Sequence, residues 1–215
     1  MQKHLYILTG ASRGMGLAIA EQLLQAGNTL ICISRNQQAS LTAKAQQAGA
    51  HLAQWTHDLV DGATASLALK AWLEKQTAQA FQSATLINNA GVISELTPLR
   101  EGQLDDLAHA LRVGLEAPML LCAAFLGATQ GWSQVPRKVL NVSSGLGRRA
   151  MASSSAYCAA KAGMDHFTRC VALDEALLAH GAKVCSLPEN WLNSRTLDSK
   201  ASAELLEAEI GVSGG

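Results

Sequence analysis

The chain has 215 residues, of which 17 are Lys or Arg and 17 are Asp or Glu, so its formal net charge at pH 7 is zero. This balance removes any electrostatic case for binding nucleic acid or an anionic membrane surface. The length is sufficient for one large α/β domain with a substantial core, and the 48% content of hydrophobic residues supplies that core.

The first predicted element is an apolar strand over residues 5–8, followed by the glycine-rich turn Thr9-Gly10-Ala11-Ser12-Arg13-Gly14-Met15-Gly16. After this turn, apolar residues recur at helical spacing as far as Gly27. A turn between a strand and a helix presents backbone N–H groups and the positive helix end to a phosphate. We therefore expect dinucleotide binding here, through Gly10, Ser12, Arg13, Gly14, Met15 and Gly16. The alternative is a turn that only packs the helix on the strand.

The second predicted strand covers residues 29–34 and is followed by a helix over 41–48. An NAD-binding site usually has an acidic residue at the end of this strand, where it accepts from the ribose 2′-hydroxyl. This chain has Ser34 and Arg35 there instead, and Arg13 lies in the preceding turn. Two guanidinium groups without a carboxylate favour a 2′-phosphate, so the pattern predicts NADP(H). The alternative for Arg35 is a solvated loop charge.

The third and fourth predicted strands, residues 51–55 and 85–87, end in polar segments. Asp58 and Leu59 follow the third strand, where the carboxylate would accept from an adenine amino group. An ordinary cap or turn aspartate explains Asp58 equally well. Asn88-Asn89-Ala90-Gly91 follows the fourth strand, at the edge where an open α/β sheet binds its ligand. We expect Asn89, Ala90 and Gly91 to contact the cofactor, although the same four residues also suit a simple turn.

The remaining elements continue the alternation of strands and helices. Helical periodicity covers residues 65–80, 103–129 and 155–179, and the fifth and sixth strands cover 138–142 and 183–187. Such alternation predicts a doubly wound parallel sheet, a Rossmann fold of three α/β/α layers. The sequence shows no repeat and no shift of composition that would divide the chain. We expect one domain, with residues 1–187 carrying the cofactor and reacting groups and residues 188–215 as its atypical tail.

Tyr157 and Lys161 stand four residues apart in a helical segment, so both project from one face. Tyrosine is a poor acid–base group at neutral pH because its ordinary pKa is near 10, and a nearby ammonium favours the phenolate. Ser144 follows the fifth strand, where its hydroxyl would hold a substrate carbonyl. The alternative is an unrelated Tyr/Lys pair on a helix surface, and the neighbouring Ser143 competes with Ser144 for the proposed role.

The five cysteines are scattered singly, mostly in apolar runs, and are expected to be reduced core residues of a cytoplasmic protein: Cys32, Cys122, Cys158, Cys170 and Cys185. The first strand begins too early to leave room for a signal peptide. The longest apolar stretch, residues 117–128, is too short to span a bilayer. The six histidines show no metal-ligand spacing, so no metal site is expected.

Taken together, these motifs resemble the short-chain dehydrogenase/reductase family over residues 1–187. The matching segments are the turn at residues 9–16, Asp58, the sequences at 88–91 and 143–145, and Tyr157-Cys158-Ala159-Ala160-Lys161. The resemblance implies that Tyr157 exchanges the proton, Ser144 orients the carbonyl and Lys161 binds the nicotinamide ribose. It also implies a cofactor contact at Pro188. The segments around Leu115 and Ser144 look most like the branch of sepiapterin and benzil reductases, whose substrates are vicinal dicarbonyls.

The chain departs from the family pattern at two places. Gly114 stands where the family has an asparagine thought to link the lysine to solvent through a water, and a helical glycine calls for a packing or kink explanation. After the sixth strand, Glu189 replaces the family glycine, and the final strand is missing or altered. Residues 200–210 look like one acidic amphipathic helix.

The pattern therefore predicts an NADPH-dependent reductase that converts a ketone or dicarbonyl to an alcohol, with Tyr157 as general acid. The alternative is an NADP(H)-binding sensor or interaction protein with little or no turnover, to which Gly114 and the tail point. The resemblance also implies a homodimer or homotetramer formed through the helices at 103–129 and 155–179.

Overall fold

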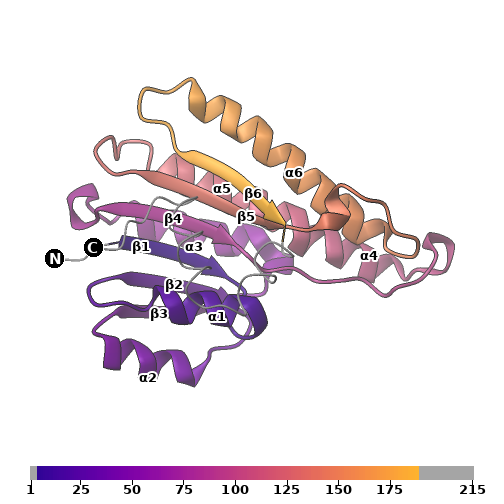
Figure 1. Ribbon diagram of the computed structural model, residues 1–215, viewed down its shortest axis with the longest axis horizontal. Helices are drawn as coiled ribbons and strands as arrows, with labels where there is room; N and C mark the ends of the chain where they lie inside the picture. The colour runs from indigo at the N-terminus through magenta and orange to yellow at the C-terminus, as the bar shows by residue number, and fades with distance from the viewer. Residues whose placement is uncertain (1–3, 189–215) are drawn as a thin grey trace.

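Six parallel strands form the centre of the structure, a computed structural model that describes residues 4–188 (Figure 1). The strands lie in the order β3-β2-β1-β4-β5-β6, so the chain runs to one edge, returns to the centre and continues to the other edge. Their bounds are β1 His4–Thr9, β2 Thr29–Ser34, β3 His51–Thr56, β4 Ser83–Asn88, β5 Arg137–Ser143 and β6 Lys183–Pro188. Every neighbouring pair is parallel, which confirms the doubly wound sheet.

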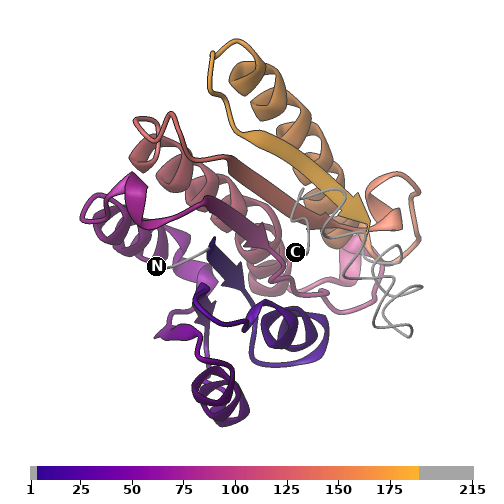
Figure 2. The same ribbon diagram turned by 60° about the vertical axis from the view of Figure 1, so that its left-hand side comes forward.

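Helices cover both faces of the sheet, because side chains alternate along each strand. In β1, Tyr6 and Leu8 pack with α1 (Gly14–Leu23) and α2 (Ala39–Ala48) on one face. Leu5 and Ile7 pack on the other face with α3 (Gly62–Leu73) and α5 (Ala117–Ala128). The two views agree that α2 lies at the β3 end of the sheet and α6 (Ser155–Ala176) at the β6 end (Figures 1 and 2).

The predicted helix over residues 65–80 is wrong at both ends. The helix begins at Gly62 because Asp61 caps it, with its carboxylate accepting from the Thr64 N–H at 3.0 Å. It ends at Leu73, and a separate short 3₁₀ turn covers Ala78–Ala80. The helix-favouring residues Glu74, Lys75 and Gln76 prolong the helical pattern in the sequence, although the backbone has already left the helix.

The long helix predicted over residues 103–129 runs from Leu104 to Ala128 and consists of three parts. These are α4 (Leu104–Leu111), a π-helical turn over Arg112–Glu116, and α5. This helix is long and apolar enough to cross a membrane, unlike residues 117–128 alone, but half of its most apolar window is buried against the rest of the protein. A core helix passes the same test.

The cysteines do not all lie in the core, in contrast to the sequence expectation. Cys32 and Cys122 are buried, whereas Cys158 and Cys185 are half-buried and Cys170 is exposed. All five are free thiols. Cys170 is exposed because it does not lie on the face of α6 that buries Ala160, Met164 and Thr168.

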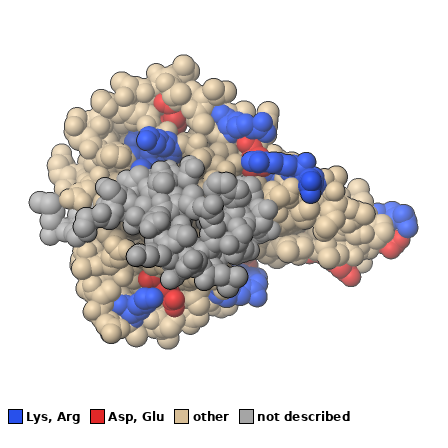
Figure 3. Space-filling model, viewed as in Figure 1, with Lys and Arg blue, Asp and Glu red and all other residues tan. Residues whose placement is uncertain are grey.

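The predicted tail, with its helix over residues 200–210 and its altered last strand, falls on residues 189–215, outside the described part. Over residues 4–188, the face shown in Figure 3 carries Lys and Arg and Asp and Glu side chains in small scattered groups of both signs. This distribution fits the neutral net charge of the chain.

A buried ion pair joins the start of β5 to the connection between α6 and β6. The Arg137 Nη2 donates to the His180 carbonyl at 2.6 Å and lies 3.9 Å from the Glu175 carboxylate. The same carboxylate accepts from the Ala182 N–H at 2.6 Å. Both side chains are nearly inaccessible to water, so removal of either one leaves an uncompensated buried charge.

We therefore expect Arg137→Met to lower the free energy of unfolding by about 3 kcal/mol, because Glu175 would lose its buried counter-charge. Urea unfolding followed by circular dichroism measures this loss. The matched control is Arg100→Met, which removes an exposed ion pair with Glu101 and is expected to cost less than about 1 kcal/mol. Equal losses in the two variants would contradict the assignment.

Candidate active site

Three backbone segments meet at the carboxyl end of β1, where they leave no room for side chains. Gly10 has a φ of 74°, which favours glycine, and its Cα faces Ala90. A Cβ atom at Gly16 would overlap the Gly10 carbonyl oxygen and the Asn89 side-chain nitrogen. Asn89 Nδ2 also donates to the Thr9 carbonyl at 3.0 Å. The turn, the start of α1 and the segment after β4 therefore form one tightly packed unit.

The first turn of α1 fits a phosphate group. Its N-cap residue, Arg13, makes no side-chain capping hydrogen bond, so the helix N–H groups keep their capacity to bind an anion. Gly14, with a φ of 56°, lets the turn enter the helix. The Ser34 hydroxyl accepts from the Ala11 N–H at 2.9 Å, which holds the end of β2 beside the turn.

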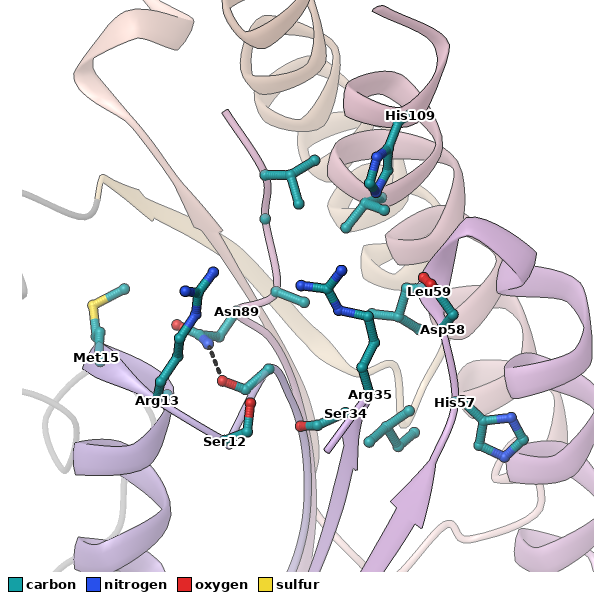
Figure 4. Close-up of a pocket in the computed structure, with 18 residues that line it drawn as sticks. Ser12, Arg13, Met15, Ser34, Arg35, His57, Asp58, Leu59, Asn89 and His109 are labelled. Carbon is teal, nitrogen blue, oxygen red and sulfur yellow. Dashed lines mark hydrogen bonds between the residues drawn. The ribbon is translucent and has the colours of Figure 1, made fainter. Parts of the chain in front are cut away.

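A pocket of about 310 Å³ opens above these segments, between the ends of β1, β2 and β4 (Figure 4). It contains most of the residues that the sequence predicted for cofactor binding: Gly10, Ser12, Arg13, Gly14, Met15, Gly16, Ser34, Arg35, Asp58, Leu59, Asn89, Ala90 and Gly91. Tyr157, Lys161 and Pro188 are outside its lining. Pro188 pairs in register with Ser143, so it reaches the same edge of the sheet.

Asp58 has two roles in this geometry. Its Oδ1 accepts from the Val60 N–H at 3.0 Å and so caps the short turn Leu59–Asp61, as the alternative interpretation of the sequence holds. It also lines the pocket, near Arg35 (Figure 4). Capping uses only one of the two carboxylate oxygens, so the structure is compatible with both interpretations.

Five residues of the pocket escaped the sequence analysis: Ile33, His57, Val92, His109 and Val113. Ile33, His57 and Val92 adjoin predicted site residues, so the strand ends were the available signal for them. His109 and Val113 belong to the long helix and are far from every motif in the sequence. Only the packing of that helix against the carboxyl end of the sheet brings them to the pocket.

Tyr157 and Lys161 of α6 lie near the carboxyl end of β5, where Lys161 Nζ bonds to Val142, and Ser144 directly follows that strand. Ser144 follows β5, and its Oγ accepts from the Leu146 N–H at 3.3 Å. Tyr157 and Lys161 lie on one face of α6. All three are nearly buried, with 3%, 6% and 3% of their surface exposed. This burial contradicts the alternative of a Tyr/Lys pair on an exposed helix surface.

Lys161 is the centre of this group. Its Nζ lies 5.7 Å from the centroid of the Tyr157 ring and donates to the Val142 carbonyl at 2.7 Å. A Cβ atom at Gly91 would lie 3.7 Å from the same Nζ. Lys161 therefore connects the tyrosine with the segment after β4, which borders the pocket. An ammonium at this position favours negative charge on neighbouring oxygen atoms.

Close packing against α6 explains why glycine occupies position 114, which lies in the π-helical turn. A Cβ atom at Gly114 would lie 3.1 Å from the Ala160 side chain on α6, so the two helices approach closely here. The preceding residue, Val113, faces the pocket. The wider π turn thus directs consecutive residues toward the pocket and toward the helix that carries Lys161. Gly114 has the packing explanation that the sequence called for.

A buried series of hydrogen-bonded polar groups joins the strands β4 and β5 to α6. Asn88 Nδ2 donates to Asn141 Oδ1 at 2.8 Å, and Asn141 Nδ2 donates to the Thr168 hydroxyl at 2.8 Å. Cys122 Sγ accepts from Asn88 Nδ2 at 3.3 Å, and burial raises the pKa of this thiol to about 12. These hydrogen bonds link β4, β5 and α6 through neutral groups, which suits a dry interior.

Asp165 lies one helical turn beyond Lys161 and is also buried. A Cβ atom at Gly147 would meet the Asp165 carboxylate at 3.0 Å, so the segment after Ser144 packs directly on this residue. Arg148 Nε lies 3.9 Å from the carboxylate and supplies its counter-charge. Within residues 4–188, neither carboxylate oxygen has a hydrogen-bond partner. The packing of Gly147 on Asp165 and the Arg148–Asp165 ion pair hold the segment that begins at Ser144 against α6.

Comparison with known proteins gives a consistent result. A family model described as short chain dehydrogenase matches residues 4–186. A benzil reductase ((S)-benzoin forming) of Bacillus cereus is 34% identical over 178 residues, which cover 83% of this chain and 71% of that protein. Sepiapterin reductase of Xenopus tropicalis is 31% identical over 180 residues, which cover 80% of this chain and 69% of that protein.

Solved structures show the same architecture. A short-chain dehydrogenase/reductase of Burkholderia vietnamiensis superposes with a TM-score of 0.71 at 36% sequence identity, over 87% of this chain and 83% of that one. A metagenomic short-chain oxidoreductase in complex with NADP superposes with a TM-score of 0.73 at 26% identity, over 85% and 80% of the two chains.

Proposed function

The chain belongs to the short-chain dehydrogenase family of oxidoreductases, and on this premise we propose that it is an NADPH-dependent carbonyl reductase. The observation that carries the proposal is the buried Tyr157–Lys161 pair. The ammonium of Lys161 lies 5.7 Å from the Tyr157 ring and borders Gly91 at the edge of the pocket. A buried phenol beside a buried ammonium is a costly arrangement in a protein interior, and proton transfer is a function that explains it.

The residues of the pocket fit a dinucleotide cofactor. The cradle at Gly10 and Gly16, which side chains would fill, and the uncapped start of α1 suit a pyrophosphate. Arg13 and Arg35 line the same pocket and supply positive charge for a 2′-phosphate. NADPH, when bound, supplies the hydride that reduces the carbonyl carbon. The NADP complex of the metagenomic oxidoreductase supports this choice of cofactor.

The groups of this chain supply the proton and stabilise the developing charge. The Ser144 hydroxyl donates a hydrogen bond to the substrate carbonyl oxygen and orients it. The Tyr157 hydroxyl donates its proton to the same oxygen as the alkoxide forms, and so acts as general acid. The Lys161 ammonium stabilises the resulting phenolate and also holds the nicotinamide ribose. Its bond to the Val142 carbonyl keeps the ammonium in place.

We infer that the substrate is a ketone, and that a vicinal dicarbonyl such as benzil is the first compound to test. Support comes from the 34% identity to the benzil reductase of Bacillus cereus and from the similarity to a sepiapterin reductase. The chain matches about seven-tenths of each of these relatives, and the substrate is assigned by analogy with them.

Tyr157→Phe is expected to lower kcat for benzil reduction by about 10³-fold, because the general acid is lost. The Kd for NADPH, measured by fluorescence titration, is expected to change little, since the ring and Lys161 remain. Absorbance of the reduced cofactor follows the reaction. A wild-type protein that binds NADPH tightly without turnover would contradict the reductase and support the alternative of an NADP(H)-binding sensor.

Arg35→Gln is expected to raise the Kd for NADPH about 30-fold, because charge-assisted bonds to the 2′-phosphate contribute about 1.5–3 kcal/mol. The Kd for NADH, which lacks this phosphate, is expected to stay unchanged. Isothermal titration calorimetry measures both constants, and Arg100→Gln, outside the pocket, serves as the control. Equal weakening of both cofactors would show that Arg35 does not recognise the 2′-phosphate.

We further propose that the protein is a homodimer assembled through α4, α5 and α6, with a homotetramer as the alternative. Large apolar side chains are exposed on these helices, including Leu104, Met119 and Leu173, the first at 81%. Apolar groups on neighbouring helices suit a symmetric interface.

Leu173→Glu is expected to shift the assembly to the monomer, because it places a charge in the proposed interface. Sedimentation velocity distinguishes the monomer from the dimer. Leu67→Glu on α3, which is equally exposed but distant from α6, is expected to leave the assembly intact. A monomeric wild type would overturn the proposal.

A cytoplasmic location is the last part of this proposal. All five cysteines are free, including the exposed Cys170, which suits a reducing compartment.

A further inference from the structure

His109 enters the pocket from a helix that carries no cofactor motif. It lies on α4, and its ring is directed down into the pocket, on the opposite side from Arg35, which rises from the end of β2 (Figure 4). The residue is half-buried. Leu59 and Val113 also line this part of the pocket and provide apolar surface. An imidazole and a guanidinium thus face each other across a gap with apolar walls.

The pocket has two distinguishable ends. Gly91 borders the Lys161 ammonium, so the end near Gly91 leads to Ser144 and Tyr157, where the chemistry takes place. His109 and Arg35 lie at the end formed by β2 and β3, and none of the three reacting groups lines this part. The glycine-turn residues Ser12, Arg13 and Met15 lie across the pocket from Asp58 and Leu59 (Figure 4). A dinucleotide with its reactive ring beside Tyr157 therefore has its second base near His109.

The chemistry of this end suits a flat, electron-rich base. Bases stack on aromatic side chains and on the planes of Arg guanidinium groups. Removal of the aromatic ring therefore weakens binding of the base. Leu59 and Val113, both nearly buried, give this end of the pocket an apolar lining. The carboxylate of Asp58, which lines the same end, has one oxygen engaged in capping Val60.

We propose that His109 stacks on the adenine base of the cofactor and acts as a specificity-determining residue for adenine dinucleotides. The inference rests on the proposed function, since it takes NADPH as the ligand. It adds a residue from α4 to a site whose other lining residues, except Val113 in the π turn, come from the strand ends and turns of β1 to β4. It also gives the half-buried imidazole a role that packing of α4 alone does not require.

The test measures the Kd of 2′,5′-ADP, which contains the adenine and the 2′-phosphate but no nicotinamide, by calorimetry. His109→Leu is expected to raise this Kd about tenfold, at the lower end of the range for base–aromatic stacking. His109→Phe keeps an aromatic ring of similar size and is expected to retain most of the affinity. His166→Leu, an exposed histidine on α6 outside the pocket, is the matched control and is expected to bind as the wild type does.

The pair of variants separates stacking from simple filling of space, because leucine fills the position without a ring. Equal weakening in His109→Leu and His109→Phe, or unchanged binding in both, would overturn the inference. Thermal unfolding without ligand shows whether the fold is intact. The inference is supported if His109→Leu unfolds at the wild-type temperature but binds 2′,5′-ADP more weakly, while His109→Phe binds it as the wild type does. A wild-type protein that binds neither 2′,5′-ADP nor NADPH would instead overturn the proposed function, and the inference with it.

Discussion

The close approach of Gly10, Gly16 and Asn89 is the constraint on which the rest of the site depends. A side chain at Gly16 would overlap the Gly10 carbonyl, so only glycine lets α1 begin directly above the end of β1. This contact aims the first N–H groups of α1 at the pocket and brings the segment after β4 beside the turn. Gly91, at the end of that segment, then borders Lys161. One steric requirement thus positions the phosphate cradle and connects it to the reacting groups.

The reacting end depends on a different principle, the support of buried charge by neighbouring dipoles and ions. Lys161 is almost inaccessible to water, and the Val142 carbonyl accepts a hydrogen bond from its Nζ at 2.7 Å. Asp165, one turn along α6, is also buried and has Arg148 as its counter-charge. An uncompensated charge in such surroundings would be expensive, so these contacts hold α6 and the segment after β5 in a single arrangement. Pre-organised groups of this kind are effective because they need little rearrangement during the reaction.

The long helix joins the two ends of the site. Its π turn places Val113 in the pocket and Gly114 against Ala160, next to Lys161. A glycine inside a helix costs about 1 kcal/mol relative to alanine, and the close packing on α6 offsets that cost. The pattern of the family to which the chain belongs has an asparagine at this position. The glycine therefore changes the surroundings of Lys161 while it preserves the contact between the two helices.

The sequence by itself determined the parallel α/β fold, because strand-length apolar runs alternate with helical periodicity, and local chemistry marked each strand end. The glycine turn, the segment after β4 and the spacing of Tyr157 and Lys161 are local patterns, and the structure brings their residues to one edge of the sheet. Local patterns did not locate the ends of α3 or the exposure of Cys170. Nor did they indicate His109 and Val113, because the packing of a distant helix against the sheet decides which face of that helix reaches the pocket. Such contacts join residues far apart in the chain, and only the tertiary structure decides them.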